Sequence, residues 1–264
     1  MNRRGAILTG LSPDPKSILS RLAWSSVSLA ALVALWWLAA LLIDSRNLPG
    51  PGAVLAALGE AAVSGELHTH VLITLARVAV SFTLAMVIGT AIGIFLGRKP
   101  GADHFFDGWL ILALNMPALV TIILCYIWFG LTEVAAILAV TVNKIPNVAV
   151  TVREGARTVS RELTEMAQVY RFGRWKTLRH VIGPQLNPFI SASARTGLAL
   201  VWKIVLVVEL LGRSNGVGFQ LHLFFQLFDI ASILAYAIAF IIVVQMIEIF
   251  LLQPWDRAAN RWRP

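Results

Sequence analysis

The sequence predicts an all-α integral membrane protein with about six transmembrane helices, each about 20 residues or longer. Three observations support this fold class. Hydrophobic residues make up 58% of the 264 positions, against roughly 45–50% in an average soluble domain. Charged residues make up only 14%, where about 25% is usual. Mean hydropathy is +0.75, and the apolar residues gather in runs without a polar face.

The first predicted span follows a short basic tail at residues 1–23. Its apolar run exceeds the 7–15 residues of a signal-peptide core, so we expect an uncleaved span. A turn-rich break at Leu48–Gly52 and a short helix at residues 53–63 come next. The six predicted spans cover residues 24–43, 71–96, 105–129, 134–152, 189–211 and 231–252.

Glycine and proline mark local features inside these spans. Gly89, Gly93 and Gly97 recur every fourth residue, which predicts close packing of one helix on another. Pro117 interrupts the third span and predicts a kink. A glycine-rich turn at residues 212–218 leads into an amphipathic stretch before the sixth span. We find no internal repeat, so residues 24–253 are expected to form one transmembrane domain with a C-terminal tail at 254–264.

The distribution of Lys and Arg predicts the orientation. Most of the 22 basic residues fall in the two tails, after the second span, and between residues 153 and 179. Only Arg46 and Arg213 fall in loops on the opposite side. Cytoplasmic loops carry the excess of positive charge, so both termini are expected in the cytoplasm. The net charge of +8 is therefore a topology signal, and no nucleic acid partner is expected.

The basic loop between the fourth and fifth spans, residues 160–184, predicts two small amphipathic helices. Ser160 can cap the first helix, with Glu162 in its first turn. One apolar stripe is formed by Leu163, Met166, Ala167 and Tyr170, and a second by Trp175, Leu178 and Ile182. Gly173 permits a turn between them, and Pro184 is expected to end the second. Such a loop suits a partner's groove, or it could lie on the lipid headgroups.

The same loop resembles the coupling loop of binding-protein-dependent ABC importer permeases. Its Glu165-Met166-Ala167 start, Gly173 and Ile182-Gly183-Pro184 end follow that motif. Two positions depart from it. Arg171 stands where the motif has its glycine, which suggests a shifted bend, and Gly183 replaces a leucine.

Other segments resemble the nitrate/sulfonate/taurine class of these permeases. They are Leu48-Pro49-Gly50-Pro51, Leu75-Ala76-Arg77-Val78, Glu209-Leu210-Leu211-Gly212 and Gly216-Val217-Gly218. The resemblance implies a type I ABC importer-like permease in the bacterial inner membrane. It implies two copies forming a translocation pathway, two cytoplasmic ATPase subunits, and a periplasmic or lipid-anchored binding protein. The substrate would be a small solute, by expectation anionic: a sulfonate, taurine, nitrate or similar.

The resemblance also implies which residues contact the ATPase. These are Glu165, Met166, Ala167, Tyr170, Arg171, Gly173, Trp175, Leu178, Ile182 and Pro184. The chain itself is not expected to bind ATP or to be an enzyme. Its nearest approach to a phosphate loop, Gly10–Ser17, has Pro15 where a backbone amide must face phosphate. ATP and Mg²⁺ are therefore expected on the partner.

Ionisable residues at membrane depth often mark a pathway or an internal pair. Lys144, Arg195, Lys203 and Glu209 are the candidates for the substrate pathway. The alternatives are that Arg195 extends to the cytoplasmic surface, that Lys144 pairs with Glu248, that Lys203 pairs with Glu248 or a carbonyl, and that Glu209 is hydrated. His68 and His70 lack a nearby cluster of carboxylates, and the single cysteine, Cys125, lies in an apolar run, so no metal site is expected.

Two other functions are alternatives to an importer subunit. A secondary transporter is typically built from inverted repeats with broken helices, and no such pair is evident. A membrane anchor subunit of an enzyme would need histidines and acidic residues gathered near one interface, whereas the five histidines are scattered. An ABC importer permease is the function that the sequence favours.

Overall fold

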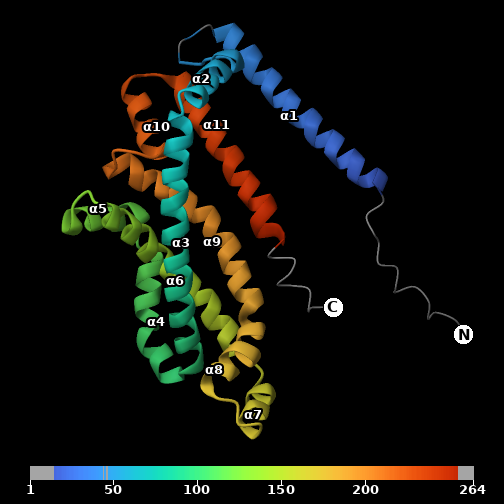
Figure 1. Ribbon diagram of the computed structural model, residues 1–264, viewed down its shortest axis with the longest axis vertical. Helices are drawn as coiled ribbons and strands as arrows, with labels where there is room; N and C mark the ends of the chain where they lie inside the picture. The colour runs from blue at the N-terminus through green and yellow to red at the C-terminus, as the bar shows by residue number, and fades with distance from the viewer. Residues whose placement is uncertain (1–14, 44, 46, 255–264) are drawn as a thin grey trace, which may run out of the picture.

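The computed structural model describes residues 15–43, 45 and 47–254, and every regular element in this part is helical. Most of the predicted N-terminal tail and nearly all of the predicted C-terminal tail lie outside the described residues. The molecule is elongated, with α2 and α10 near one end and α7 and α8 at the other (Figure 1). We call these the α10 end and the α7 end.

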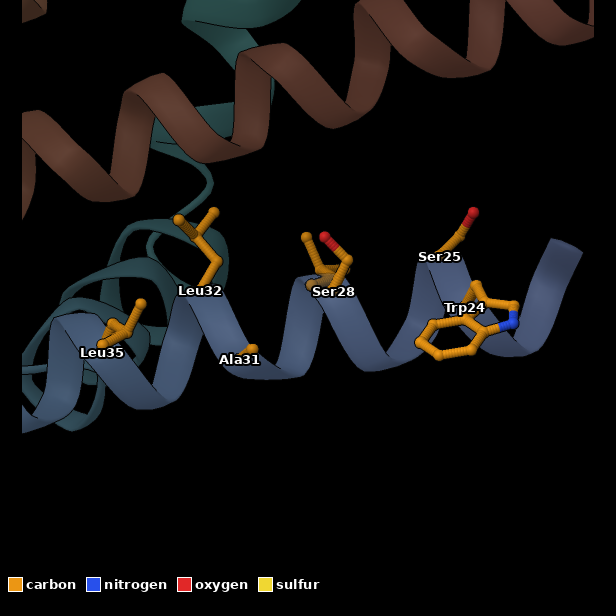
Figure 2. Close-up of a pocket in the computed structure, with 7 residues that line it drawn as sticks. Trp24, Ser25, Ser28, Ala31, Leu32 and Leu35 are labelled. Carbon is orange, nitrogen blue, oxygen red and sulfur yellow. The ribbon is translucent and has the colours of Figure 1, made fainter.

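The N-terminal helix α1, Pro15–Ile43, extends away from the other helices (Figure 1). None of its span from Ala23 to Ile43 is buried within the described protein. Figure 2 shows side chains along this helix, including Ser25, Ser28 and Leu32, around a hollow lined only by α1. The residues that line the hollow carry no titratable group.

The short helix α2, Pro51–Val63, begins with proline in its first turn, where the missing N–H has no partner to lose. Trp36 of α1 donates a hydrogen bond from its indole nitrogen to the carbonyl of Pro49, at 3.1 Å. This bond joins α1 to the turn before α2. The predicted break and short helix are therefore confirmed.

The longest helix is α3, Glu66–Arg98, with 33 residues. It contains the predicted second span. The three glycines of the repeat in this span face α6, Glu133–Arg157. A Cβ added at Gly93 would lie 2.7 Å from the carbonyl oxygen of Ala149, and one at Gly97 would lie 2.6 Å from the Cβ of Ala156. The glycines thus let two backbones approach closely, as predicted.

The predicted third span is bent. It consists of α4, Pro100–Asn115, and α5, Ala118–Phe129, which meet at 95°. Pro117 is the N-cap of α5, with an extended backbone, and the residue before a proline disfavours helical geometry. The predicted kink is therefore confirmed, and it is close to a right angle.

The C-terminal half contains α9, Gly183–Gly212, α10, Val217–Gln226, and α11, Ile230–Ile247, followed by a π-helical turn, Glu248–Leu252. α9 packs against α3, α5, α6 and α10. The main apolar core lies among these helices and α11, and includes Val78, Val140, Val201 and Tyr236.

By length and apolarity, four helices of the described residues can cross a membrane, or five if the bent pair is one span. The predicted number was about six. The difference lies in α9, which contains the predicted fifth span but also Arg195, Lys203 and Glu209. At about 1.5 Å per residue α9 is long enough to cross a bilayer. The all-helical membrane architecture is confirmed.

Candidate functional site

The loop at the α7 end begins with α7, Arg161–Val169. The hydroxyl of Ser160 accepts a hydrogen bond from the N–H of Leu163 at 3.3 Å, and Glu162 lies in the first turn. Ala167 is buried, whereas Met166 and Tyr170 are 39% and 71% exposed. The predicted cap and amphipathic helix are confirmed, and most of the apolar stripe faces outward.

The bend after α7 is made by Arg171 and not by Gly173. Arg171 has a φ of 52°, in the left-handed region that favours glycine. The N–H of Phe172 bonds to the carbonyl of Ala167, and the N–H of Arg171 bonds to that of Gln168, at 2.8 and 2.9 Å. This pair of bonds is a Schellman motif with arginine at the glycine position. The bend has therefore not shifted, and the expectation that Gly173 makes it is wrong.

The second half of the loop continues into α9. Gly173 precedes α8, Arg174–Thr177, which is followed by a π-helical turn, Leu178–Ile182, and then by α9. Pro184 lies in the first turn of α9, where proline is tolerated. The expectation that Pro184 ends the second helix is wrong. The loop is instead continuous with the longest helix of the C-terminal half.

The other predicted loop residues divide by exposure. Trp175 is 71% exposed, Leu178 is half-buried, and Ile182 is buried among Ala156 and Leu186. The carboxylate of Glu165 pairs with Arg161 at 2.8 Å, and both side chains are largely exposed. Exposed pairs of this kind contribute little to stability. Glu165 and Arg161 therefore form a surface ion pair on α7.

At the α10 end, Glu209 is fully buried, so the alternative that it is hydrated is wrong. Its carboxylate accepts hydrogen bonds from Arg77 at 2.7 Å, from Thr74 at 2.9 Å and from the N–H of Gly218 at 2.8 Å. A Cβ at Gly216, where φ is 106°, would lie 2.4 Å from the carboxylate carbon. Glycine at this position makes room for the buried charge.

Arg77 extends this network to a third helix. Its guanidinium contacts Glu133 of α6 at 2.6 and 2.9 Å, and both the carbonyl and the side chain of Asn215. Glu133 also pairs with Arg213 at 2.6 Å. Two arginines and two glutamates thus balance one another where α3, α6 and α9 meet. The predicted segments around Arg77, Glu209 and Gly216 are brought together here.

His70 belongs to the same region. Its Nδ1 accepts from the N–H of Gly216 at 3.0 Å, and its Nε2 lies 2.7 Å from the side-chain amide of Gln220. Among the described residues no group of histidine, cysteine and acidic side chains could hold a metal ion. His70 therefore fixes the turn between α9 and α10.

The four predicted pathway residues lie in different places. Lys144 is buried, at 2% exposure. Lys203 is exposed on α9, together with Arg195. The partner of Glu248 is Arg195, at 3.4 Å, so the expectation that Lys144 or Lys203 holds this carboxylate is wrong. The structure therefore does not bring these four residues into one cluster.

A second ion-pair network, which was not predicted from the sequence, joins α4 to α6 near the α7 end. Arg153 pairs with Asp103 at 3.0 Å and with Asp107 at 2.6 Å, and Arg157 also contacts Asp103. Arg153 and Asp103 are both buried. A charged residue in or beside an apolar helix indicates that a partner exists, but it does not reveal which residue that partner is.

Bent and continuous apolar helices with an exposed amphipathic loop at one end define a membrane protein with several spans. The chain belongs to the family described as binding-protein-dependent transport system inner membrane component, whose model matches residues 89–253. This family consists of ABC importer subunits that work with ATPase and substrate-binding partners. The secondary transporter and the enzyme anchor are thereby set aside.

Relatives and solved structures agree with this assignment. The chain is 29% identical to the putative aliphatic sulfonates transport permease protein SsuC of Bacillus subtilis, over 89% of this chain and 85% of SsuC. It is 29% identical to the taurine transport system permease protein TauC of Escherichia coli, over 74% of each chain. It is 27% identical to the riboflavin transport system permease protein RibX of Chloroflexus aurantiacus, over 97% of each chain.

The fold is similar to that of an inward-facing MetNI methionine ABC transporter chain. The TM-score is 0.64 with 19% identity, and the match covers 75% of this chain and 98% of the other. At this identity the likeness concerns the fold alone. The fold of a known importer permease is thus present here.

Proposed function

We propose that two copies of this chain form the translocation pathway of an ATP-driven importer for a small anionic solute. Each copy docks its α7 loop on one of two cytoplasmic ATPase subunits. A periplasmic or lipid-anchored binding protein delivers the solute at the α10 end. Both termini lie in the cytoplasm, in accord with the basic residues around the α7 end.

The observation that carries this proposal is the continuity of the loop with α9. From Arg174 the helical chain runs through the π-helical turn into Gly212 without an extended residue. A displacement of the loop by an ATPase would therefore reach α9 through a continuous helix. ATP and Mg²⁺ bind to the ATPase subunits, and this chain supplies the moving pathway.

One face of α9 is suited to line that pathway. Exposed residues recur along it at helical spacing: Ala192, Thr196, Ala199, Lys203 and Val207. A lysine and a threonine on an outer face are costly against lipid tails. They are accommodated where the face meets water or the second copy. We therefore place the pathway along this face of α9, at the interface of a homodimer.

The class of substrate follows from the relatives and from charge. Two of the relatives are named for sulfonates and taurine, which carry a sulfonate group, and one for riboflavin, which is uncharged at neutral pH. Lysine and arginine on and beside the α9 face favour the first group. We infer a small sulfonate or a similar oxyanion.

The first experiment is co-purification of the tagged chain in mild detergent. The wild type is expected to bring down an ATPase subunit. Met166→Glu and Tyr170→Glu place a charge on the exposed apolar stripe of α7, which is costly to bury, and should lose the ATPase. Gln168→Ala changes an exposed polar residue of the same helix and should retain it.

The outcomes separate clearly. Loss of the ATPase from both stripe variants but not from Gln168→Ala supports docking through the apolar face. A wild-type chain that purifies as a folded dimer without any ATPase contradicts the importer proposal. A monomer that nevertheless binds the ATPase would contradict the homodimer alone.

A further inference from the structure

Lys144 is the most deeply placed cation of the transmembrane helices. It lies near the middle of α6, a helix of 25 residues, and only 2% of its surface is exposed. The side chain crosses to α9 and fills the space above Gly197. A Cβ at Gly197 would lie 2.5 Å from Cε and 3.1 Å from Nζ of Lys144. Glycine at position 197 therefore makes room for the lysine.

The acidic residues around this helix are engaged elsewhere. Glu209 and Glu133 bind arginines at the α10 end, Asp103 binds arginines at the α7 end, and Glu248 binds Arg195. Within the described part of the chain no carboxylate forms an ion pair with Lys144. A buried ammonium group without a counter-charge is strongly disfavoured, so this lysine calls for an anion from outside the chain.

Two hydroxyl groups on the helices that pack against α6 also have unused hydrogen-bonding capacity. The Oγ atoms of Ser81 and Ser193 are buried and have no partner among the described residues. The hydroxyl of Thr141, one turn from Lys144, donates to the carbonyl of Ile137 at 2.7 Å and also lies 3.4 Å from the carbonyl of Ser81, which places Ser81 near this level of α6. Ser193 precedes Gly197 by one turn of α9. Three helices thus contribute donors to the same region of the membrane domain.

We propose that Lys144 binds the anionic group of the transported solute, assisted by the hydroxyls of Ser81 and Ser193. The inference rests on the proposed importer function and names the residue that selects an oxyanion. Gly197 is adjacent to Thr196 on the exposed face of α9. With no side chain at position 197, the flexible lysine can swing its ammonium over the glycine toward the pathway. In a region poor in water, its attraction for an anion is strengthened.

The test uses the complete importer, reconstituted in lipid vesicles with the ATPase that co-purifies and its binding protein. ATP-dependent uptake of radiolabelled methanesulfonate, taurine and nitrate is compared with uptake of riboflavin. Lys144→Gln is expected to lower uptake of the preferred anion by about tenfold or more, because a hydrogen bond to a charged group is lost. The matched control is Lys99→Gln, which removes an exposed lysine after α3 and should leave uptake unchanged.

A second variant separates binding from a merely structural role. Lys144→Met removes a buried charge and keeps a similar volume, so the melting temperature of the complex should stay the same or rise. Uptake of the anion should nevertheless fall as in Lys144→Gln. A fall in melting temperature with uptake per folded complex unchanged would assign Lys144 to the fold and overturn the proposal.

The remaining outcomes are equally decisive. A wild type that imports riboflavin but none of the anions overturns the assignment of Lys144 while leaving the importer function standing. Anion uptake that is equal in wild type and Lys144→Gln does the same. A complex with no ATP-dependent transport of any solute contradicts the proposed function itself, and the role of Lys144 falls with it.

Discussion

The guanidinium of Arg77 lies 2.7 Å from the carboxylate of Glu209, and the two residues are 132 positions apart in the sequence. Arg77 belongs to α3 and Glu209 to α9, and Glu133 attaches α6 to the same guanidinium. The three helices that form the centre of the membrane domain are therefore held together at their α10 end by one arginine. The α7 end has its own, separate ion-pair network around Asp103.

Replacing Glu209 by alanine should be strongly destabilising. It leaves Arg77 buried with only part of its charge balanced, and breaking a buried pair from one side typically costs about 3–5 kcal/mol. The measurement is the thermal unfolding of the purified chain in detergent. Arg161→Ala, which breaks the exposed pair with Glu165, should cost less than about 1 kcal/mol. Equal losses in the two variants would show that the network contributes no more than a surface pair.

Replacing Gly93 by alanine should also weaken the protein, through packing and not charge. The new Cβ would lie 2.7 Å from a backbone oxygen of α6, and overpacking of this kind typically costs about 1–3 kcal/mol. Gly108→Ala is the matched control, because nothing lies within 4 Å of its Cβ. There the better helix propensity of alanine should leave stability unchanged or raise it by up to about 1 kcal/mol. The measurement is the melting temperature, which should fall in Gly93→Ala and stay the same or rise in Gly108→Ala.

Local sequence signals predicted the features that depend on local chemistry. The glycine repeat of α3, the cap at Ser160 and the break at Pro117 each follow from a few neighbouring residues. The partners of Arg77 and Glu248 could not be predicted in this way, since they depend on which helices pack together. A charged residue in an apolar segment indicates that a partner exists, but it does not indicate where that partner lies.

The loop at residues 160–184 shows the same division in one segment. The stripe of Leu163, Met166 and Tyr170 follows from helical spacing and was predicted. The left-handed bend at Arg171 was not, because glycine is the residue that ordinarily marks it and a glycine stands two positions later. Backbone hydrogen bonds at the end of α7 determine the bend. These bonds involve no side-chain atom of residue 171. The prediction that Pro184 ends a helix was wrong for a related reason, since proline is found at the start of helices as well as after their ends.

Arg171→Gly should therefore stabilise the end of α7. Glycine avoids the steric cost of a left-handed residue, about 1–2 kcal/mol, and loses part of this gain to its greater freedom when unfolded. Slower hydrogen exchange of the amides of Arg171 and Phe172 is the expected result. Gly173→Ala has an ordinary φ of −62° and open space around its Cβ, and exchange should not change. Faster exchange in Arg171→Gly would contradict a Schellman motif at this position.

The proposed orientation can be tested with single cysteines. Cys125 is buried and is the only cysteine in the sequence, so Cys125→Ser gives a protein without any thiol that the reagent could label. A cysteine at the exposed position Glu162 should react with a membrane-impermeant reagent only after the cells are opened. A cysteine at the exposed position Ser214, beside α10, should react from the periplasm of intact cells with a permeable outer membrane. The reverse pattern would invert the topology.

The distance in sequence between Arg77 and its partners also bears on how the chain is made. A ribosome adding about 5–20 residues each second delivers Glu133 several seconds after Arg77, and Glu209 only after more than twice that interval. During this time α3 has a charged side chain within an apolar segment and no counterpart yet synthesised. The α3 helix must therefore wait in the insertion machinery, or enter the bilayer provisionally, until α6 supplies the first carboxylate and α9 the second.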